Sequence, residues 1–244
     1  MNIKLLFLGI STDRLIGLGE QSTKIEGIRF DSRIPHLEYE FYENIAAHEV
    51  VRQIVEAERN GYDAAVIGCF YDPGLREARE LVEMPVVGVC EASLSLANML
   101  SAGDFTVLVG RRKWIPKMMS TAKSYGLDAR IASWRVLGLT VPEMRNAEKT
   151  REAILRESRA AVEGDMAECI VLGCTGMLGQ AMEVQKELGI PILDPVLSGI
   201  KVAEMKAVLW RRFGISHSKI GGYEPPPSVE LKDIWKKVYG TDIR

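Results

Sequence analysis

Short apolar runs and longer amphipathic segments alternate along the chain. Buried strands are predicted where Val, Ile and Leu cluster, over 3–10, 63–68, 85–89, 104–110, 168–173 and 191–194. These runs are continuously apolar, as is typical of parallel strands covered on both faces. Helical patterns are predicted over 44–60, 73–83, 91–101, 114–125, 143–163, 177–188 and 196–212. Alternation of this kind predicts an α/β fold with right-handed crossovers.

The pattern repeats within the chain. The stretch AAVIGCFYDPGLREARELVEMPVVGV can be laid on CIVLGCTGMLGQAMEVQKELGIPILDP, and the Gly-Cys pair at 68–69 then falls on that at 173–174. A proline opens the next strand 16 residues after the first cysteine, at Pro85, and 17 after the second, at Pro191. We therefore predict two pseudo-symmetric lobes, each a parallel sheet flanked by helices, with the active site in the cleft between them.

The boundary between the lobes is expected near the stretch SAGD. The first lobe is expected to span 1–101 and to carry Cys69, and the second to span 102–204 and to carry Cys174. The segment 205–244 is expected to return to the first lobe. Its end is Pro-rich and then amphipathic and basic, which favours packing on a neighbouring surface such as another subunit. A homo-oligomer is therefore predicted.

Composition is ordinary for a globular protein. Of the 244 residues, 47% are apolar and 26% charged. The net charge of −2 lacks the excess of basic residues that is typical of nucleic-acid-binding proteins. No apolar run reaches the roughly 18–20 residues that a membrane helix needs, and the N-terminal MNIKLLFLGI lacks the features of a signal peptide. We expect a cytoplasmic protein whose partner is a small-molecule substrate, with no nucleic acid and no membrane. Its four cysteines are then expected as free thiols.

Cys69 and Cys174 each end a predicted strand. Ligands bind beyond the carboxyl ends of parallel strands, so facing lobes would point both thiols into one cleft. Asp72 is predicted to cap the helix after Cys69, with Pro73 at its first position, and a helix N-terminus is expected to lower a thiol's pKa. A thiolate and a thiol on opposite sides of a carbon can move a proton between its two faces. The pattern therefore favours racemisation at an acidic carbon next to a carbonyl.

Other polar groups at this sheet edge are candidates for substrate binding. Ser11 and Thr12 follow the first predicted strand and offer hydroxyl donors. Backbone N–H groups of the glycine-containing turns, that of Gly176 among them, could stabilise an enolate oxygen. Thr175 either donates to the substrate or caps its own helix.

For several neighbouring residues the sequence is compatible with either a structural role or a role in the site. Phe70 either walls the pocket or packs between helices. Glu91 and Asp194 are either helix-terminal acidic residues, which the helix dipole favours, or site residues. Cys90 ends a predicted strand and could approach the cleft, whereas Cys169 lies inside a strand and is expected in the core.

No metal and no cofactor are expected. The sequence contains no HExxH motif, no paired CxxC and no P-loop. The three histidines lack the spacing of metal ligands; they are His36, His48 and His217.

The stretches VIGCFYDPGLREARELVEMPVVGVCEAS and IVLGCTGM together resemble the aspartate/glutamate/hydantoin racemase superfamily. Within it the chain is most similar to hydantoin racemases, with allantoin racemases as near relatives. The resemblance covers most of 40–215, and the tail SHSKIGGYEPPP is similar too. It implies cofactor-independent racemisation of a 5-substituted hydantoin or related cyclic ureide, with Cys69 and Cys174 as the acid/base pair, in a dimer or larger assembly.

One loop departs from the family pattern and keeps alternatives open. The family usually has an NPNT-like loop after its first strand, whereas residues 9–12 here read GIST and lack both asparagines. Alternatives of the same fold are an amino-acid racemase of the Asp/Glu type and a maleate-type cis–trans isomerase. Cysteine at both positions argues against a single-cysteine decarboxylase. A non-catalytic small-molecule sensor is the alternative of a different class.

Overall fold

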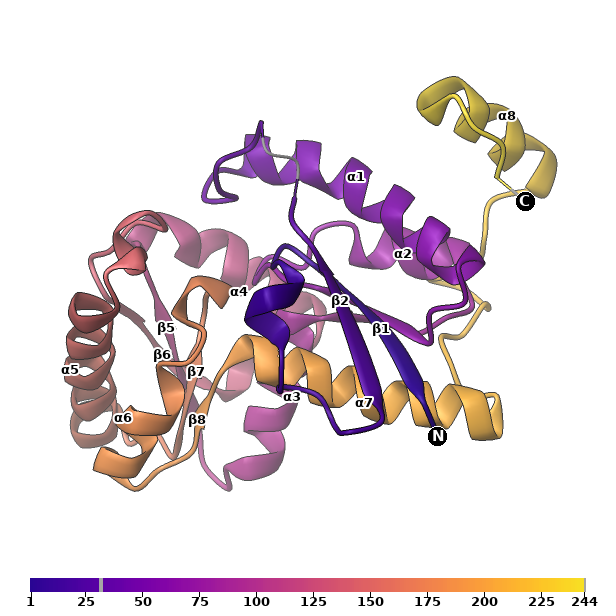
Figure 1. Ribbon diagram of the computed structural model, residues 1–244. Helices are drawn as coiled ribbons and strands as arrows, with labels where there is room; N and C mark the ends of the chain where they lie inside the picture. Colours follow the sequence, from indigo (N-terminus) through magenta and orange to yellow (C-terminus); the bar gives the residue numbers. More distant parts are fainter. Residues whose placement is uncertain (31–32, 244) are drawn as a thin grey trace.

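The computed structural model describes residues 1–30 and 33–243, and in this part of the chain two parallel sheets of four strands each form the frame (Figure 1). The strands of the first sheet, in spatial order, are β2 (Thr23–Ile28), β1 (Ile3–Leu8), β3 (Ala64–Ile67) and β4 (Val86–Gly88). Those of the second, in the same relative order, are β6 (Ile131–Val136), β5 (Phe105–Val109), β7 (Cys169–Leu172) and β8 (Ile192–Leu193). The repeated order confirms the predicted α/β fold of two pseudo-symmetric sheets.

Helices flank both sheets, and each predicted helix corresponds to an observed one. In chain order the helices are α1 (Glu40–Arg59), α2 (Leu75–Leu81), α3 (Val89–Leu100), α4 (Ile115–Ser124), α5 (Ala147–Asp165), α6 (Ala181–Leu188), α7 (Pro195–Phe213) and α8 (Ser228–Tyr239). Helices α5 and α6 start later than predicted, because short 3₁₀ turns over Glu143–Arg145 and Thr175–Met177 precede them.

Strands β2 and β6 were not predicted, and both lie at the edges of their sheets. An edge strand is covered less than a central one, so its sequence mixes polar with apolar residues. The sequences TKIEGI and IASWRV do so, and their residues are mostly half-buried. The central strands β3 and β7 are fully buried and carry the continuous apolar runs that were recognised.

Glycines at the ends of β3 and β7 let the chain turn against its neighbouring strand. Gly68 and Gly173 each donate a 2.8 Å hydrogen bond to a carbonyl at the end of the adjacent strand, that of Leu8 or Leu108. A Cβ atom added at Gly68 would lie 2.3 Å from the Leu8 oxygen, and one at Gly173 would lie 2.7 Å from the Leu108 oxygen. The residue before each cysteine must therefore be a glycine, because a neighbouring strand leaves no room for a side chain.

The predicted start of α2 is wrong. The helix begins at Leu75, after Gly74 in the left-handed conformation with φ +72°, and Asp72 makes no capping bond to it. Asp72 itself has a positive φ of 50°, and its carboxylate accepts a hydrogen bond from the backbone N–H of Cys90 at the start of α3. The Asp72 side chain, which the local pattern assigns to the start of α2, is thus bound instead by a backbone group of α3.

Helix α7 connects the two halves of the molecule. It follows β8 of the second sheet but packs on β3, β4 and α3. Gly199 makes this close approach possible, because a Cβ there would lie 2.8 Å from Val66 and 2.9 Å from Val89. The return of the chain to the first sheet therefore begins in α7 (Figure 1).

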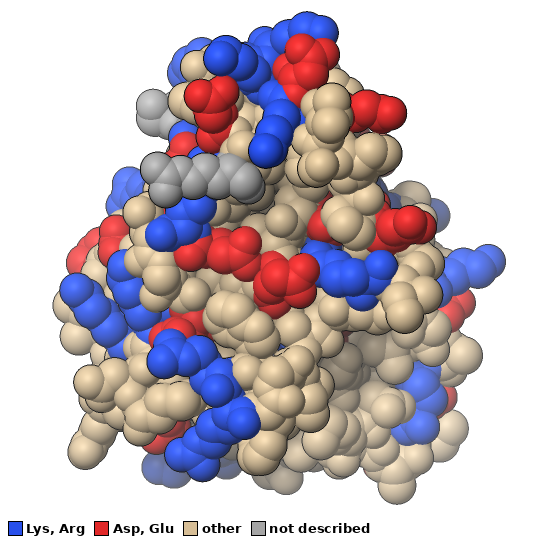
Figure 2. Space-filling view, turned by 90° about the vertical axis from the view of Figure 1, so that its right-hand side faces the viewer, with Lys and Arg blue, Asp and Glu red and all other residues tan. Residues whose placement is uncertain are grey.

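Helix α8 lies at the periphery, attached mainly through aromatic side chains. Trp235 is buried against the cluster formed by α1, α2 and the first sheet. On the face shown in Figure 2, acidic and basic side chains are interspersed rather than gathered by sign. Within the described residues, no helix has the length and apolarity to cross a bilayer.

Candidate active site

A cavity of about 870 Å³ is lined by turns at the carboxyl ends of both sheets. The turns after β1 and β3 contribute from the first sheet, and the turns after β6 and β7 from the second. Cys69 and Cys174 both line it, so the fold brings together the two thiols that the repeat singled out. Both are free and half-buried.

Most of the predicted site residues reach this cavity. Besides the cysteines, the predicted residues that line it are Ser11, Phe70, Thr175 and Gly176. Cys174 caps its own 3₁₀ turn, since its Sγ accepts from the Gly176 N–H at 3.4 Å. The capping role considered for Thr175 is thus filled by the cysteine.

Other candidates lie outside the cavity lining. The Thr12 hydroxyl accepts from the backbone N–H of Gly27 at 2.9 Å and holds β2 against the turn after β1. Glu91 faces away and forms an ion pair with the buried Arg79. Asp194 is buried and caps α7, accepting from the Val196 N–H at 2.8 Å. All three are explained by structural contacts.

The remaining cysteines are core residues. Cys90 and Cys169 have no exposed surface, and neither lines the cavity. Cys90 belongs to the first turn of α3, and Cys169 opens β7. The core assignment of Cys169 agrees with its expected position, and the approach considered for Cys90 does not occur.

Burial raises the pKa of both site thiols, against the expectation that helix N-termini would lower it. For Cys69, desolvation raises the pKa well above its usual range, and the charges of Cys174, Asp72 and Glu43 raise it further. For Cys174, desolvation raises the pKa to about 11, and the Gly176 N–H opposes the shift. The expectation failed because loss of hydration outweighs a few backbone dipoles. A thiolate formed here is a stronger base than an ordinary thiolate, and a smaller fraction of each thiol is ionised near neutral pH.

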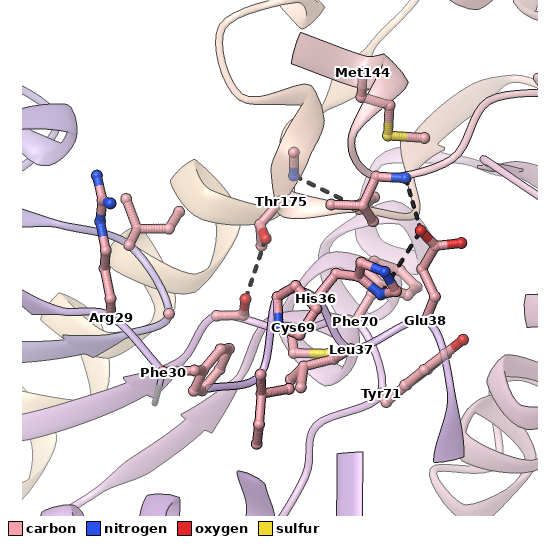
Figure 3. A pocket seen from close by; sticks show the side chains of 18 of the residues that line it. Arg29, Phe30, His36, Leu37, Glu38, Cys69, Phe70, Tyr71, Met144 and Thr175 are labelled. Atoms are coloured by element: carbon pink, nitrogen blue, oxygen red, sulfur yellow. Dashed lines mark hydrogen bonds and ion pairs between the residues drawn. The ribbon is translucent and has the colours of Figure 1, made fainter. Parts of the chain in front are cut away.

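Apolar side chains form much of the cavity wall. They come from both halves of the chain, and they include Phe30, Leu37, Phe70, Trp114, Met118 and Met144 (Figure 3). Three exposed guanidinium groups also contribute, those of Arg14, Arg29 and Arg145. The cavity wall is therefore mixed, with apolar side chains beside polar ones such as Ser11, His36 and Glu38, and with basic groups that reach solvent.

Residues 18–203 match the family model described as Asp/Glu/Hydantoin racemase. The chain belongs to this family. It is an isomerase, a racemase. This racemase is 37% identical over 195 residues to the hydantoin racemase of Pseudomonas sp. (strain NS671), covering 80% of this chain and 76% of that protein. It is 36% identical over 194 residues to the hydantoin racemase of Paenarthrobacter aurescens, covering 78% and 79%.

A solved structure shares the whole arrangement. The allantoin racemase from Klebsiella pneumoniae superposes with a TM-score of 0.84 at 26% identity, over 92% of this chain and 94% of that one. The likeness therefore covers nearly the whole of this racemase.

The cavity lining includes a buried carboxylate that sequence reasoning missed. Glu38 lies in the loop before α1, and its Oε1 accepts from the Val141 N–H at 2.9 Å. Its Oε2 accepts from Arg111 at 3.1 Å, and His36 Nδ1 lies 3.8 Å from Oε1 (Figure 3). Val141 and Arg111 belong to the second half, so Glu38 ties the loop over the cavity to it. No local pattern marks Glu38, because its partners lie 103 and 73 positions away.

Proposed function

We propose that this racemase inverts C5 of a 5-substituted hydantoin, or of a related cyclic ureide, by proton transfer between Cys69 and Cys174 without a cofactor. The observation that carries the proposal is that two thiols from equivalent turns of a repeated fold line one cavity. The similarity to two hydantoin racemases supports the choice of substrate class.

The proposed reaction needs two opposed sulfur atoms. One thiolate takes the C5 proton, and the electron pair of the C–H bond moves into the adjacent carbonyl to give an enolate. The other thiol donates its proton to the opposite face of C5, and its sulfur becomes the thiolate. After one turnover the sulfurs have exchanged protonation states, so the opposite enantiomer is processed next by reversed roles. N–H groups of the two cysteine turns and the Ser11 hydroxyl are the proposed donors to the enolate oxygen.

The cavity wall favours an apolar substituent at C5. Aromatic and Met side chains would surround such a group, and their burial supplies binding energy roughly in proportion to the apolar area covered. A ureido substituent, as in allantoin, would instead need hydrogen-bond partners among the polar groups of the lining, such as His36 and Glu38. We therefore propose arylalkyl or alkyl hydantoins ahead of allantoin.

One observation favours a second candidate, an amino-acid racemase of the Asp/Glu type. Arg14, Arg29 and Arg145 line the cavity, and guanidinium groups bind carboxylates well. A hydantoin lacks a carboxylate unless its substituent carries one. Activity on free aspartate or glutamate, without activity on hydantoins, would replace the first proposal with the second.

Loss of optical activity tests the proposal. D- and L-5-benzylhydantoin, allantoin, aspartate and glutamate are each incubated with the full chain, with deuterium uptake at the α-carbon followed by mass spectrometry. Cys69→Ser and Cys174→Ser are each expected to lower the rate by about 10²–10⁴-fold. Cys169→Ala changes a cysteine of the core and is the control, which should racemise at the wild-type rate. Full activity in either serine variant would exclude the two-base mechanism. Binding with no proton exchange would favour the sensor alternative.

A further inference from the structure

A buried carboxylate lies directly behind Cys69. Asp72 is 6% exposed, and its backbone N–H donates to the Cys69 carbonyl at 2.9 Å, closing the turn that presents the thiol. The positive φ of Asp72 turns its side chain into the protein and away from α2. The turn and the carboxylate therefore form one unit.

The carboxylate joins three separate elements. Its Oδ1 accepts from the Cys90 N–H at 3.0 Å, and its Oδ2 accepts from the Glu91 N–H at 2.9 Å, both in the first turn of α3. Oδ2 also accepts from the Tyr125 hydroxyl at 2.7 Å. Tyr125 ends α4, which follows the first strand of the second half. The position of the Cys69 turn is thus fixed by groups from both halves of the chain.

Gly88 is shaped to receive this carboxylate. A Cβ atom added there would lie 2.3 Å from the Asp72 carboxyl carbon, closer than unbonded atoms can approach. Gly88 precedes α3, so the missing side chain opens the way to the N–H groups of the helix. The arrangement requires a glycine at one position and a short carboxylate at the other.

We propose that Asp72 is a positioning residue of the reaction: it fixes the Cys69 turn against α3 and Tyr125, and its negative charge disfavours a second negative charge on the Cys69 sulfur. The inference rests on the proposed two-base function. Asp72 does not line the cavity, so it acts through Cys69 and not on the substrate.

The charges around the pair agree with this role. Cys69 is faced by Asp72, Cys174 and Glu43, and each of these raises its pKa. Asp72 is faced by Cys90, Glu91 and Tyr125; burial raises its own pKa to about 7, opposed by the two N–H groups and the tyrosine hydroxyl. Asp72 therefore gains its charge near neutral pH and carries it fully at pH 8.5.

The second half offers a matched control. Asp194 is 2% exposed, caps α7, and accepts from the Gly179 N–H at 2.9 Å, five residues after Cys174. Its charge is not among the influences on the pKa of either site thiol. Asp194→Asn thus removes a buried capping carboxylate whose charge is not a leading influence on the pKa of either thiol.

The test compares alkylation by a neutral and an anionic reagent in the full-length protein at pH 8.5. Rates at Cys69 and Cys174 are measured by peptide mass spectrometry with iodoacetamide and iodoacetate. Loosening of the fold changes both rates together, whereas loss of a nearby negative charge favours iodoacetate. Asp72→Asn is expected to raise the iodoacetate-to-iodoacetamide ratio at Cys69 about threefold or more, with Cys174 unchanged. Asp194→Asn should leave the ratio unchanged at both cysteines.

Turnover tests the positioning. Asp72→Asn is expected to lower kcat about tenfold or more, and Tyr125→Phe, which leaves the carboxylate in place, to lower kcat about 3–10-fold with KM unchanged. Tyr239→Phe, which loses a peripheral hydroxyl bond to the His48 carbonyl, is the control for Tyr125→Phe. An unchanged ratio at Cys69, an equal rise at both cysteines, or wild-type kcat in either site variant overturns the proposal. If Asp72→Asn does not fold, the kcat of Tyr125→Phe decides. Failure of the wild-type protein to racemise hydantoins would count against the proposed function, and the alkylation ratio would still report on Asp72.

Discussion

The hydroxyl of Thr175 donates a hydrogen bond to the backbone carbonyl of Gly68 across 3.1 Å (Figure 3). Gly68 directly precedes Cys69, and Thr175 directly follows Cys174. One hydrogen bond therefore joins the two cysteine turns of the pseudo-symmetric sheets. It fixes the position of one sulfur-bearing turn relative to the other, which a two-base reaction requires.

Removing this bond should weaken catalysis more than folding. A neutral hydrogen bond contributes about 0.5–1.5 kcal/mol, so Thr175→Val is expected to lower kcat/KM by about 3–10-fold. Thr175→Ser keeps the hydroxyl and should retain most of the activity. Steady-state kinetics on both variants, with thermal unfolding as the control, checks the prediction. Equal activity in the Val and Ser variants would show that the bond does not set the geometry.

The contacts of Glu38 predict that removing its charge lowers the stability of the fold. Glu38→Gln keeps an acceptor for the Val141 N–H but loses the ion pair with Arg111, which is 36% exposed. The free energy of unfolding should fall by about 1–2 kcal/mol, measured by urea denaturation. Glu152→Gln, at an exposed position in the middle of α5, is the control and should change the free energy of unfolding by less than about 0.5 kcal/mol. Because the Glu38 charge raises the pKa of Cys174, alkylation of Cys174 should also become faster in Glu38→Gln.

The apolar wall predicts which substituents the cavity accepts. Leu37 lies on the loop held by Glu38 and lines the cavity (Figure 3). Leu37→Trp fills space where a bulky C5 substituent would lie, so activity on 5-benzylhydantoin should fall about tenfold or more relative to 5-methylhydantoin. The ratio of kcat/KM values for the two substrates is the readout. An unchanged ratio would place the substituent elsewhere.

His217 should make stability depend on pH at the acidic side. Its Nε2 accepts from the Val86 N–H of edge strand β4 at 2.8 Å, so the bond needs neutral imidazole. Burial, helped by Arg79, Lys206 and Lys219, lowers the pKa of His217 from 6.5 to about 3. The unfolded chain binds the proton first. The contribution of His217 is therefore fully present above about pH 6.5 and is lost as the pH falls toward 3.

A glutamine at this position separates the effect from other acid titrations. The amide oxygen of His217→Gln can accept from Val86 but does not titrate. The fall in Tm between pH 7 and 5 should be smaller than in the wild type by about 2–4 °C. His48→Gln, on the exposed side of α1, is the control and should follow the wild type. A variant curve parallel to that of the wild type would contradict the assignment.

The sequence alone determined the central part of the fold and the position of the two candidate cysteines. Strands β3 and β7 are buried on both faces, so their apolar runs had to be continuous and could be recognised. The glycine before each cysteine is required by a neighbouring strand, which made the repeat visible in the letters. Local pattern and close packing thus specified where the thiols lie.

Only the tertiary structure decided the surroundings of those thiols. Edge strands β2 and β6 are held by pairing with a neighbour rather than by their own apolarity. Glu38 and Asp72 form hydrogen bonds with residues distant in the chain, and the sequence around each carboxylate does not show which distant residues will lie beside it. The raised pKa of both cysteines follows from burial, which arises only when the two halves pack together and remove water from the sulfur atoms.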